Sequence, residues 1–254
     1  MKRLSITCLF VCCMLYAFGQ TEAQRFKEKQ LQYPYLLKTE LKDQTTKYDF
    51  AWIFTYADNS IIYGFIGDNY QRIRIKFITV TKDTSDPGTY HIYGKSMVKN
   101  NIDEFSGTIK ISAIRKFKPL QHGCEDESKY KGYKGEFILL GDYTFRENST
   151  QNHAGVFKGS LRSDFFINKN DEIQYDDIED CSDSYTNNQF VGQWTAYKGS
   201  VIKRCNWGDY RIPNSGNFDI GAGDFSPGGY DGKYVQNGWQ NLNDERIEKA
   251  KWWE

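Results

Sequence analysis

The alternation of apolar and polar residues over 137–167 constrains this chain more than any other feature of its sequence. In the first arm of this stretch, the apolar side chains fall two apart, at Phe137, Leu139, Tyr143 and Phe145. The second arm repeats the pattern from Gly155 to Ile167, and the intervening residues 147–152 are all polar. Period-two spacing around a polar connector is typical of an antiparallel hairpin, so we expect one here.

Similar alternation extends through most of the chain on both sides of this hairpin. It is clearest where Ile73, Ile75 and Phe77 alternate with basic residues, as in a strand with one face in water. The other segments expected to be strands are 50–56, 61–66, 90–98, 105–113, 190–196 and 201–212. The sequence therefore predicts a mainly β fold of eight or nine strands that pair outward from the hairpin.

The flanking segments differ from this β region in composition. We expect a β domain over 48–212, a polar leader over 20–47 and an irregular extension rich in Gly and Asn over 213–254. In the leader, residues 24–29 suit either a short helix or a disordered segment. Turn residues dominate the extension, and its last part, 243–253, suits a short closing helix capped by Asn243.

The first 19 residues have the composition of a secretory signal peptide. Lys2 and Arg3 precede a short apolar run over 4–18, and small residues suit cleavage between Gly19 and Gln20. The run is shorter than the ~20 residues of a membrane-spanning helix, and no later run approaches that length. A secreted, periplasmic or cell-envelope location is therefore expected, with no transmembrane span after cleavage.

Removal of the signal peptide changes both the charge and the cysteine count. The mature chain keeps 31 basic and 33 acidic side chains, which argues against a nucleic-acid partner. Its remaining cysteines are Cys124, Cys181 and Cys205. An oxidising compartment favours one disulfide and one free thiol. We favour Cys181–Cys205, with Cys124 as an alternative partner of either. Metal binding is disfavoured because no CxxC spacing occurs.

Catalytic motifs are absent from the sequence. The three histidines are scattered, and no GxSxG, HExxH or P-loop pattern occurs. Glu136, Asp142 and Glu147 on the expected hairpin are conceivable as paired carboxylates of a glycosidase, but we interpret them as surface charge. The acidic run over 171–183 could wrap a calcium ion, although a solvated loop is the simpler interpretation. No catalytic residue, metal site or cofactor is predicted, and a non-enzymatic role is favoured.

Aromatic residues make up 16% of the chain and provide the candidate binding residues. Ring faces and polar groups mix over 194–211, a composition that suits a carbohydrate or peptide. The candidate ligand-binding residues are Trp194, Tyr197, Trp207, Tyr210 and Arg211. The alternative is that these rings pack the extension onto the β domain.

The signal peptide, the succession of short strands with internal glycines such as Gly94 and Gly107, and the strand count resemble small exported lipocalin-like (calycin-type) barrels over residues 48–197. The resemblance implies a single antiparallel up-and-down barrel that carries a small ligand. The Gly-x-Trp motif of lipocalins is missing, because Phe50 stands where Trp52 would need a glycine. The expected function is an exported, non-catalytic barrel that binds a small ligand or an envelope or extracellular partner. The alternative is a carbohydrate-binding or carbohydrate-active protein that uses residues 194–211.

Overall fold

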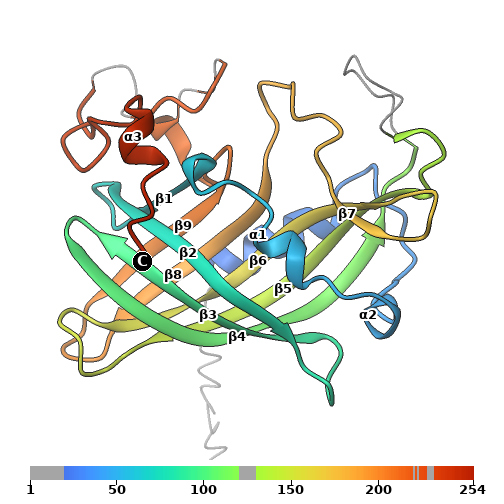
Figure 1. The fold of residues 1–254 in the computed structure, drawn as a ribbon, viewed down its shortest axis with the longest axis horizontal. Coiled ribbons are helices and arrows are strands. Elements are labelled where there is room, and N and C mark those ends of the chain that lie inside the picture. Colours follow the sequence, from blue (N-terminus) through green and yellow to red (C-terminus); the bar gives the residue numbers. More distant parts are fainter. Residues whose placement is uncertain (1–19, 120–129, 220, 222, 228–231) are drawn as a thin grey trace, which may run out of the picture.

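The computed structural model describes residues 20–119, 130–219, 221, 223–227 and 232–254; the predicted signal peptide and Cys124 lie outside these ranges. Nine strands make up most of the regular secondary structure of the described chain (Figure 1). They are β1 (Ile62–Ile66), β2 (Gln71–Lys82), β3 (Thr89–Val98), β4 (Asn101–Lys116), β5 (Gly135–Glu147), β6 (Gly155–Ile167), β7 (Ile173–Tyr175), β8 (Asn187–Ala196) and β9 (Ile202–Asp209).

Eight of these strands close into a barrel. Each pairs in antiparallel fashion with its neighbour along the chain, and β9 pairs with β1 to complete the circle. The short β7 is the exception, since it pairs only with one end of β6. Within the barrel, β6 pairs with β8. The predicted single antiparallel up-and-down barrel is thus confirmed, and β5 and β6 form the expected hairpin at its centre.

Large side chains fill the middle of the barrel. The rings of Phe190 and Trp207 stack with centroids 4.7 Å apart, and the ring of Tyr143 meets both edge to face. Gly159 and Gly192 face each other across β6 and β8, and a Cβ on either would lie within 2.7 Å of the Tyr143 hydroxyl. These two glycines therefore make room for a core side chain.

One end of the barrel is closed by a segment that the sequence pattern predicted as a strand. Residues 50–56 contain instead the 3-10 helix η1 (Ala51–Phe54), so this prediction is wrong. Phe50 and Ile53 are fully buried while Trp52 is exposed, a spacing of three rather than two. The Asp49 carboxylate accepts the Ala51 N–H at 2.9 Å, and the Tyr90 hydroxyl accepts the Phe50 N–H at 3.0 Å.

A buried polar network lies beside η1 at the same end. The amide nitrogen of Asn188 donates to the Ile53 carbonyl at 2.9 Å and to the Asp209 carboxylate at 2.8 Å. The Tyr175 hydroxyl also donates to Asp209, at 2.8 Å. Burial outweighs these donors and raises the pKa of Asp209 to about 7. The network fixes η1 to the barrel wall, so any opening into the interior must lie at the other end.

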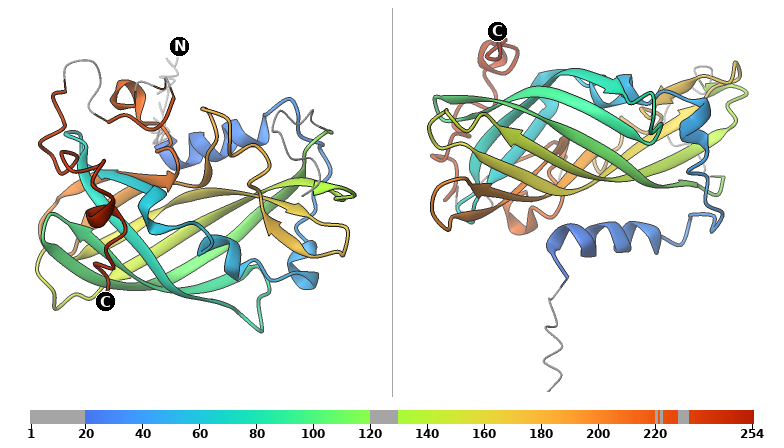
Figure 2. Two further views of the ribbon diagram at one scale, coloured as in Figure 1. Left: turned by 45° about the horizontal axis from the view of Figure 1, so that its top comes forward. Right: turned by 90° about the horizontal axis from the view of Figure 1, so that it is seen from below.

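The leader contains helix α1 (Glu22–Leu31), which lies along the outside of the barrel against β6 and β8 (Figure 2). Thr21 and Gln24 form a capping box at its start, and Phe26 is buried against the wall. The Glu22 carboxylate accepts from Nε and Nη2 of Arg204, at 2.7 and 2.8 Å. The remaining helical turns before the barrel are α2 (Gln44–Lys47) and η2 (Asn59–Ile61). None of the described helices is long and apolar enough to cross a membrane.

The C-terminal extension covers the outer face of the barrel next to β1 and β2 (Figure 1). Phe218, the last residue of η4 (Gly216–Phe218), packs on Phe65 of β1, and the buried ring of Trp239 packs on Phe218. The closing helix α3 (Glu245–Glu248) is shorter than predicted, and its cap is Asp244 rather than Asn243, because the Asp244 carboxylate accepts the Arg246 N–H. Glu248 is buried against Arg72 and Arg74 of β2.

Cys205 is a free thiol in the barrel interior, so the predicted Cys181–Cys205 disulfide is wrong. The pairing of β9 with β8 turns the Cys205 side chain inward beside Trp207, whereas Cys181 lies in an exposed turn. Of the pairings considered, only Cys124–Cys181 is compatible with a free Cys205, and Cys124 lies outside the described residues. Burial in the apolar core also raises the pKa of the Cys205 thiol.

Cys205 is therefore expected to resist alkylation in the folded protein. Iodoacetamide needs an accessible thiolate, and burial denies Cys205 both access and ionisation. Peptide mass spectrometry should find Cys205 modified only after unfolding in denaturant. Rapid modification of Cys205 under native conditions would contradict its place in the core.

Candidate ligand-binding cavity

The end of the barrel opposite η1 opens into a cavity of about 1870 Å³. Its inner wall is formed mainly by apolar side chains that point into the barrel. These are Ile66 of β1, Ile73 of β2, Val98 of β3, Phe157 of β6 and Ala196 of β8. The hollow also continues over the rim to Lys27 of α1 and Lys158 on the outer face of β6, so only part of this volume lies inside the barrel.

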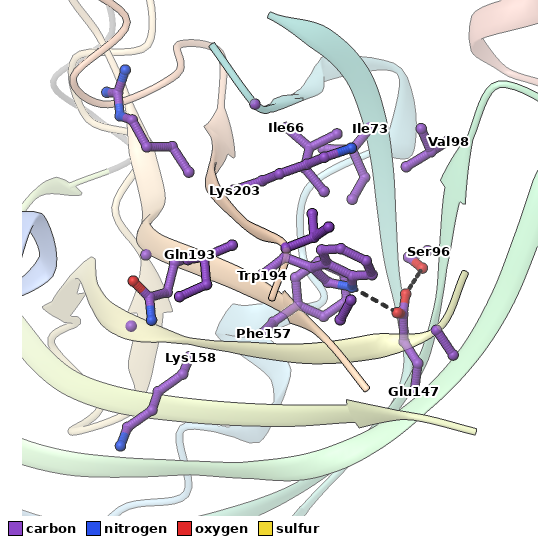
Figure 3. Close-up of a pocket in the computed structure, with 18 of the residues that line it drawn as sticks. Ile66, Ile73, Ser96, Val98, Glu147, Phe157, Lys158, Gln193, Trp194 and Lys203 are labelled. Atoms are coloured by element: carbon purple, nitrogen blue, oxygen red, sulfur yellow. Dashed lines mark hydrogen bonds between the residues drawn. The ribbon is translucent and has the colours of Figure 1, made fainter. Parts of the chain in front are cut away.

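Glu147 provides a fixed carboxylate in this cavity (Figure 3). It ends β5 on the inward-facing side and is only 5% exposed. One carboxylate oxygen accepts from the Ser96 hydroxyl at 2.6 Å, and the other accepts from the Trp194 indole N–H and the Gly155 N–H, each at 2.8 Å. Burial raises the pKa of Glu147 despite these three donors.

Asp103 supplies a second buried carboxylate. It lies on the inward-facing side of β4, is 4% exposed and lines the same cavity. The side-chain amide of Asn101 donates to it. Burial raises the pKa of Asp103, and the proximity of its charge contributes to the raised pKa of Glu147. The two carboxylates are therefore electrostatically coupled.

Lys203 brings a positive charge to the cavity. It is exposed at the start of β9, and its ammonium lies over the ring of Trp194, 5.9 Å from the centroid (Figure 3). Within the described part of the chain, this ammonium has no ion-pair partner. The cavity thus combines an apolar wall and two buried carboxylates with exposed cations at its mouth, among them Lys99, Lys198 and Lys203.

The five aromatic and basic residues predicted to bind a ligand lie in three different places. Trp194 lines the cavity, and Tyr197 stands at its rim, where its hydroxyl donates to the Glu147 carbonyl at 2.9 Å. Trp207 is buried in the core. Tyr210 packs on Tyr185 near the closed end, and Arg211 pairs with Asp219 of the extension at 2.7 Å. Because these five residues do not form one surface, the cavity is a better candidate binding region than the segment 194–211 as a whole.

Sequence reasoning missed the polar groups of the cavity. Glu147 was interpreted as surface charge, yet its side chain faces the interior, whereas Asp142 is on the outer face, where it pairs with Lys27. The signal was present, because the odd-numbered positions that bring Tyr143 and Phe145 inward also bring Glu147 inward. Asp103 and Lys203 follow the same rule on β4 and β9.

The acidic segment 171–183 does not form an evident ion site. The Asp171 carboxylate pairs with Lys47 and Lys134, which hold its pKa well below the usual range. Asp176 is half-buried, and its desolvation raises its pKa. Over the described ranges, no group of three or more His, Cys, Asp or Glu side chains comes together as a metal site would require.

Comparison of the chain with protein-family models, with curated proteins and with solved structures finds no match. The functional argument therefore depends on the geometry of the cavity. That geometry can enclose the apolar part of a small molecule and present charged groups to its polar part.

Proposed function

We propose that this protein is an exported carrier or receptor that binds a small organic molecule in the open end of its barrel. The observation that supports the proposal is the apolar cavity bounded by Ile66, Ile73, Val98 and Phe157. Ligand pockets usually enclose about 300–1,000 Å³ and combine apolar walls with a few placed polar groups. A cavity of about 1870 Å³, part of which lies outside the barrel, leaves room for such a ligand.

A non-catalytic role fits the same geometry better than catalysis. Each hydrogen bond to the Glu147 carboxylate comes from a group of the barrel itself, and these bonds fix the carboxylate in place. Closure of the other end by η1 makes the barrel a container with one opening. An eight-stranded barrel is wide enough to hold one small ligand.

Native mass spectrometry of residues 20–254, before and after organic extraction, tests the proposal. A discrete organic mass lost on extraction supports a carrier. The extracted protein is then titrated with decanol, an uncharged probe with an apolar chain, and saturable one-to-one binding is expected. Absence of both the adduct and decanol binding would overturn the proposal.

Filling part of the cavity is expected to weaken this binding. Val98→Trp places an indole at the mouth, and we expect decanol affinity to fall at least about tenfold, which corresponds to ~1.4 kcal/mol. Ile102→Trp is the matched control, because Ile102 lies at the same end of the barrel but is exposed on its outer face. Titration calorimetry compares the two variants. Equal affinities would mean that decanol binds outside the barrel.

A further inference from the structure

We infer that the cavity takes a cationic ligand, an organic amine or ammonium group on an apolar body, and that Glu147 and Asp103 meet its positive charge. The inference depends on the proposed function, since it names the class of molecule that the same cavity would bind. The two carboxylates enter the cavity from different strands, β5 and β4, so they form part of its wall and not an isolated acidic loop.

The two carboxylates of the cavity have no buried counter-charge among the described residues. Glu147 and Asp103 are both almost fully buried, and neither forms an ion pair with a Lys or Arg of the described residues. A buried carboxylate without a cation is costly, and proteins usually pair such groups or use them in function. The exposed His153 at the rim acts to lower the pKa of Asp103, but no buried cation of the described residues pairs with either carboxylate. A cation in the cavity would supply that charge.

The hydrogen bonds of Glu147 suit an ionised carboxylate. The N–H groups of Trp194 and Gly155 both donate to one oxygen, which suits an ionised carboxylate, and the Ser96 hydroxyl donates to the other. One oxygen already has two donors, and the other has only the Ser96 hydroxyl. That second oxygen retains capacity for a further donor, such as the N–H of an ammonium group.

The aromatic wall favours the same class of ligand. Trp194 and Phe157 line the cavity next to Glu147, and the face of an indole attracts cations. The ammonium of Lys203 already lies over the Trp194 ring. Lys203 is exposed and long, so a ligand cation can replace it at this ring while its own charge returns to water.

Lys203 also defines the competing possibility, a ligand with an anionic head group. Other cations, such as Lys99 and Lys198, also line the hollow, but like Lys203 they are exposed at its mouth, whereas Glu147 and Asp103 are buried within it. An anion inside the barrel would have to approach both fixed carboxylates, whereas the exposed lysines can turn away from a cation into water. The buried position of the two carboxylates therefore favours a cation.

Three probes that share one alkyl chain separate these possibilities: decylamine, decanol and decanoate are a cation, a neutral molecule and an anion at neutral pH. Titration calorimetry of extracted residues 20–254, below the concentrations at which the probes self-associate, should show decylamine binding at least about tenfold more tightly than decanol. Decanoate should bind more weakly than decanol.

Variants that remove single charges complete the test. Glu147→Gln and Asp103→Asn should each reduce the preference for decylamine over decanol at least about fivefold and leave decanol affinity within about twofold. Because Glu147→Gln also alters the contacts of Trp194, Asp103→Asn provides the independent measurement. Glu104→Gln, which removes the neighbouring exposed carboxylate of β4, should keep the preference.

Two results would overturn the inference in different ways. If decanol binds but decylamine is not preferred, or if decanoate binds most tightly and Lys203→Met abolishes its advantage, the cavity is a carrier site for another class of ligand. If none of the three probes binds, the proposed function fails together with the inference.

Discussion

Replacing Trp207 with alanine is expected to lower the free energy of unfolding by about 3–5 kcal/mol. The side chain is 2% exposed, stacks on Phe190 with an interplanar angle of 9°, and meets Tyr143 and Phe157 edge to face. Removal of the indole would leave a void at the centre of the barrel that these rings can fill only in part. Urea unfolding of residues 20–254, followed by circular dichroism, measures the loss.

Trp52→Ala is the matched control, because Trp52 is 38% exposed on η1 and packs mainly on Tyr56. Its loss should cost less than about 1 kcal/mol. A folded Trp207→Ala protein of undiminished stability that had lost glycan binding would contradict the place of Trp207 in the core. That result would favour the carbohydrate-binding alternative for residues 194–211.

Replacing Glu248 with alanine is expected to release the C-terminal extension from the barrel. The side chains of Arg72, Arg74 and Glu248 are 7%, 9% and 7% exposed, and Glu248 is the shared partner of both guanidinium groups. Its removal would leave two buried positive charges, a loss of about 3–5 kcal/mol. Hydrogen exchange should show faster exchange in residues 232–254 and in β2, with β5 and β6 unchanged.

Glu245→Ala provides the control for this effect. Glu245 lies on the same short helix, but its side chain is exposed and pairs only with Lys249. Its replacement should leave exchange in the extension unchanged. Equal protection in Glu248→Ala and Glu245→Ala would mean that the apolar cluster around Phe218 and Trp239 is sufficient to hold the extension.

The strands could be predicted because the barrel separates an apolar interior from a wetter exterior along most strands; the outer face of β2 is an exception, because the extension buries Arg72 and Arg74 there. Ile73, Ile75 and Phe77 face inward and are buried, and the expected alternation follows directly. Closure is less visible in sequence, since the pairing of β1 with β9 joins segments that are far apart in the chain.

The segment 50–56 shows where this reasoning fails. Its aromatic residues alternate as in a strand, but Ile53, between two of them, is fully buried. The segment packs across the end of the barrel, where tertiary contacts with Tyr90 and Asn188 decide its conformation.

The cavity residues were missed because polarity was taken to mean exposure. Glu147 borders a polar turn, and only its position in the alternation of β5 reveals that it faces the interior. Cys205 illustrates the same rule, since its place two residues before Trp207 brings both side chains to the inner face of β9. The odd or even position of a residue along its strand predicted which face it occupies better than its polarity did.

The pairing of the first barrel strand with the last has a consequence for how the chain folds. The ladder between β1 and β9 cannot form until almost the whole barrel sequence has left the ribosome. Until then the two strands expose unpaired backbone groups, which are prone to aggregate with other chains. Contacts of such long sequence separation also slow folding. The extension follows β9 in the chain, so it can pack on β1 only after β1 and β9 have paired.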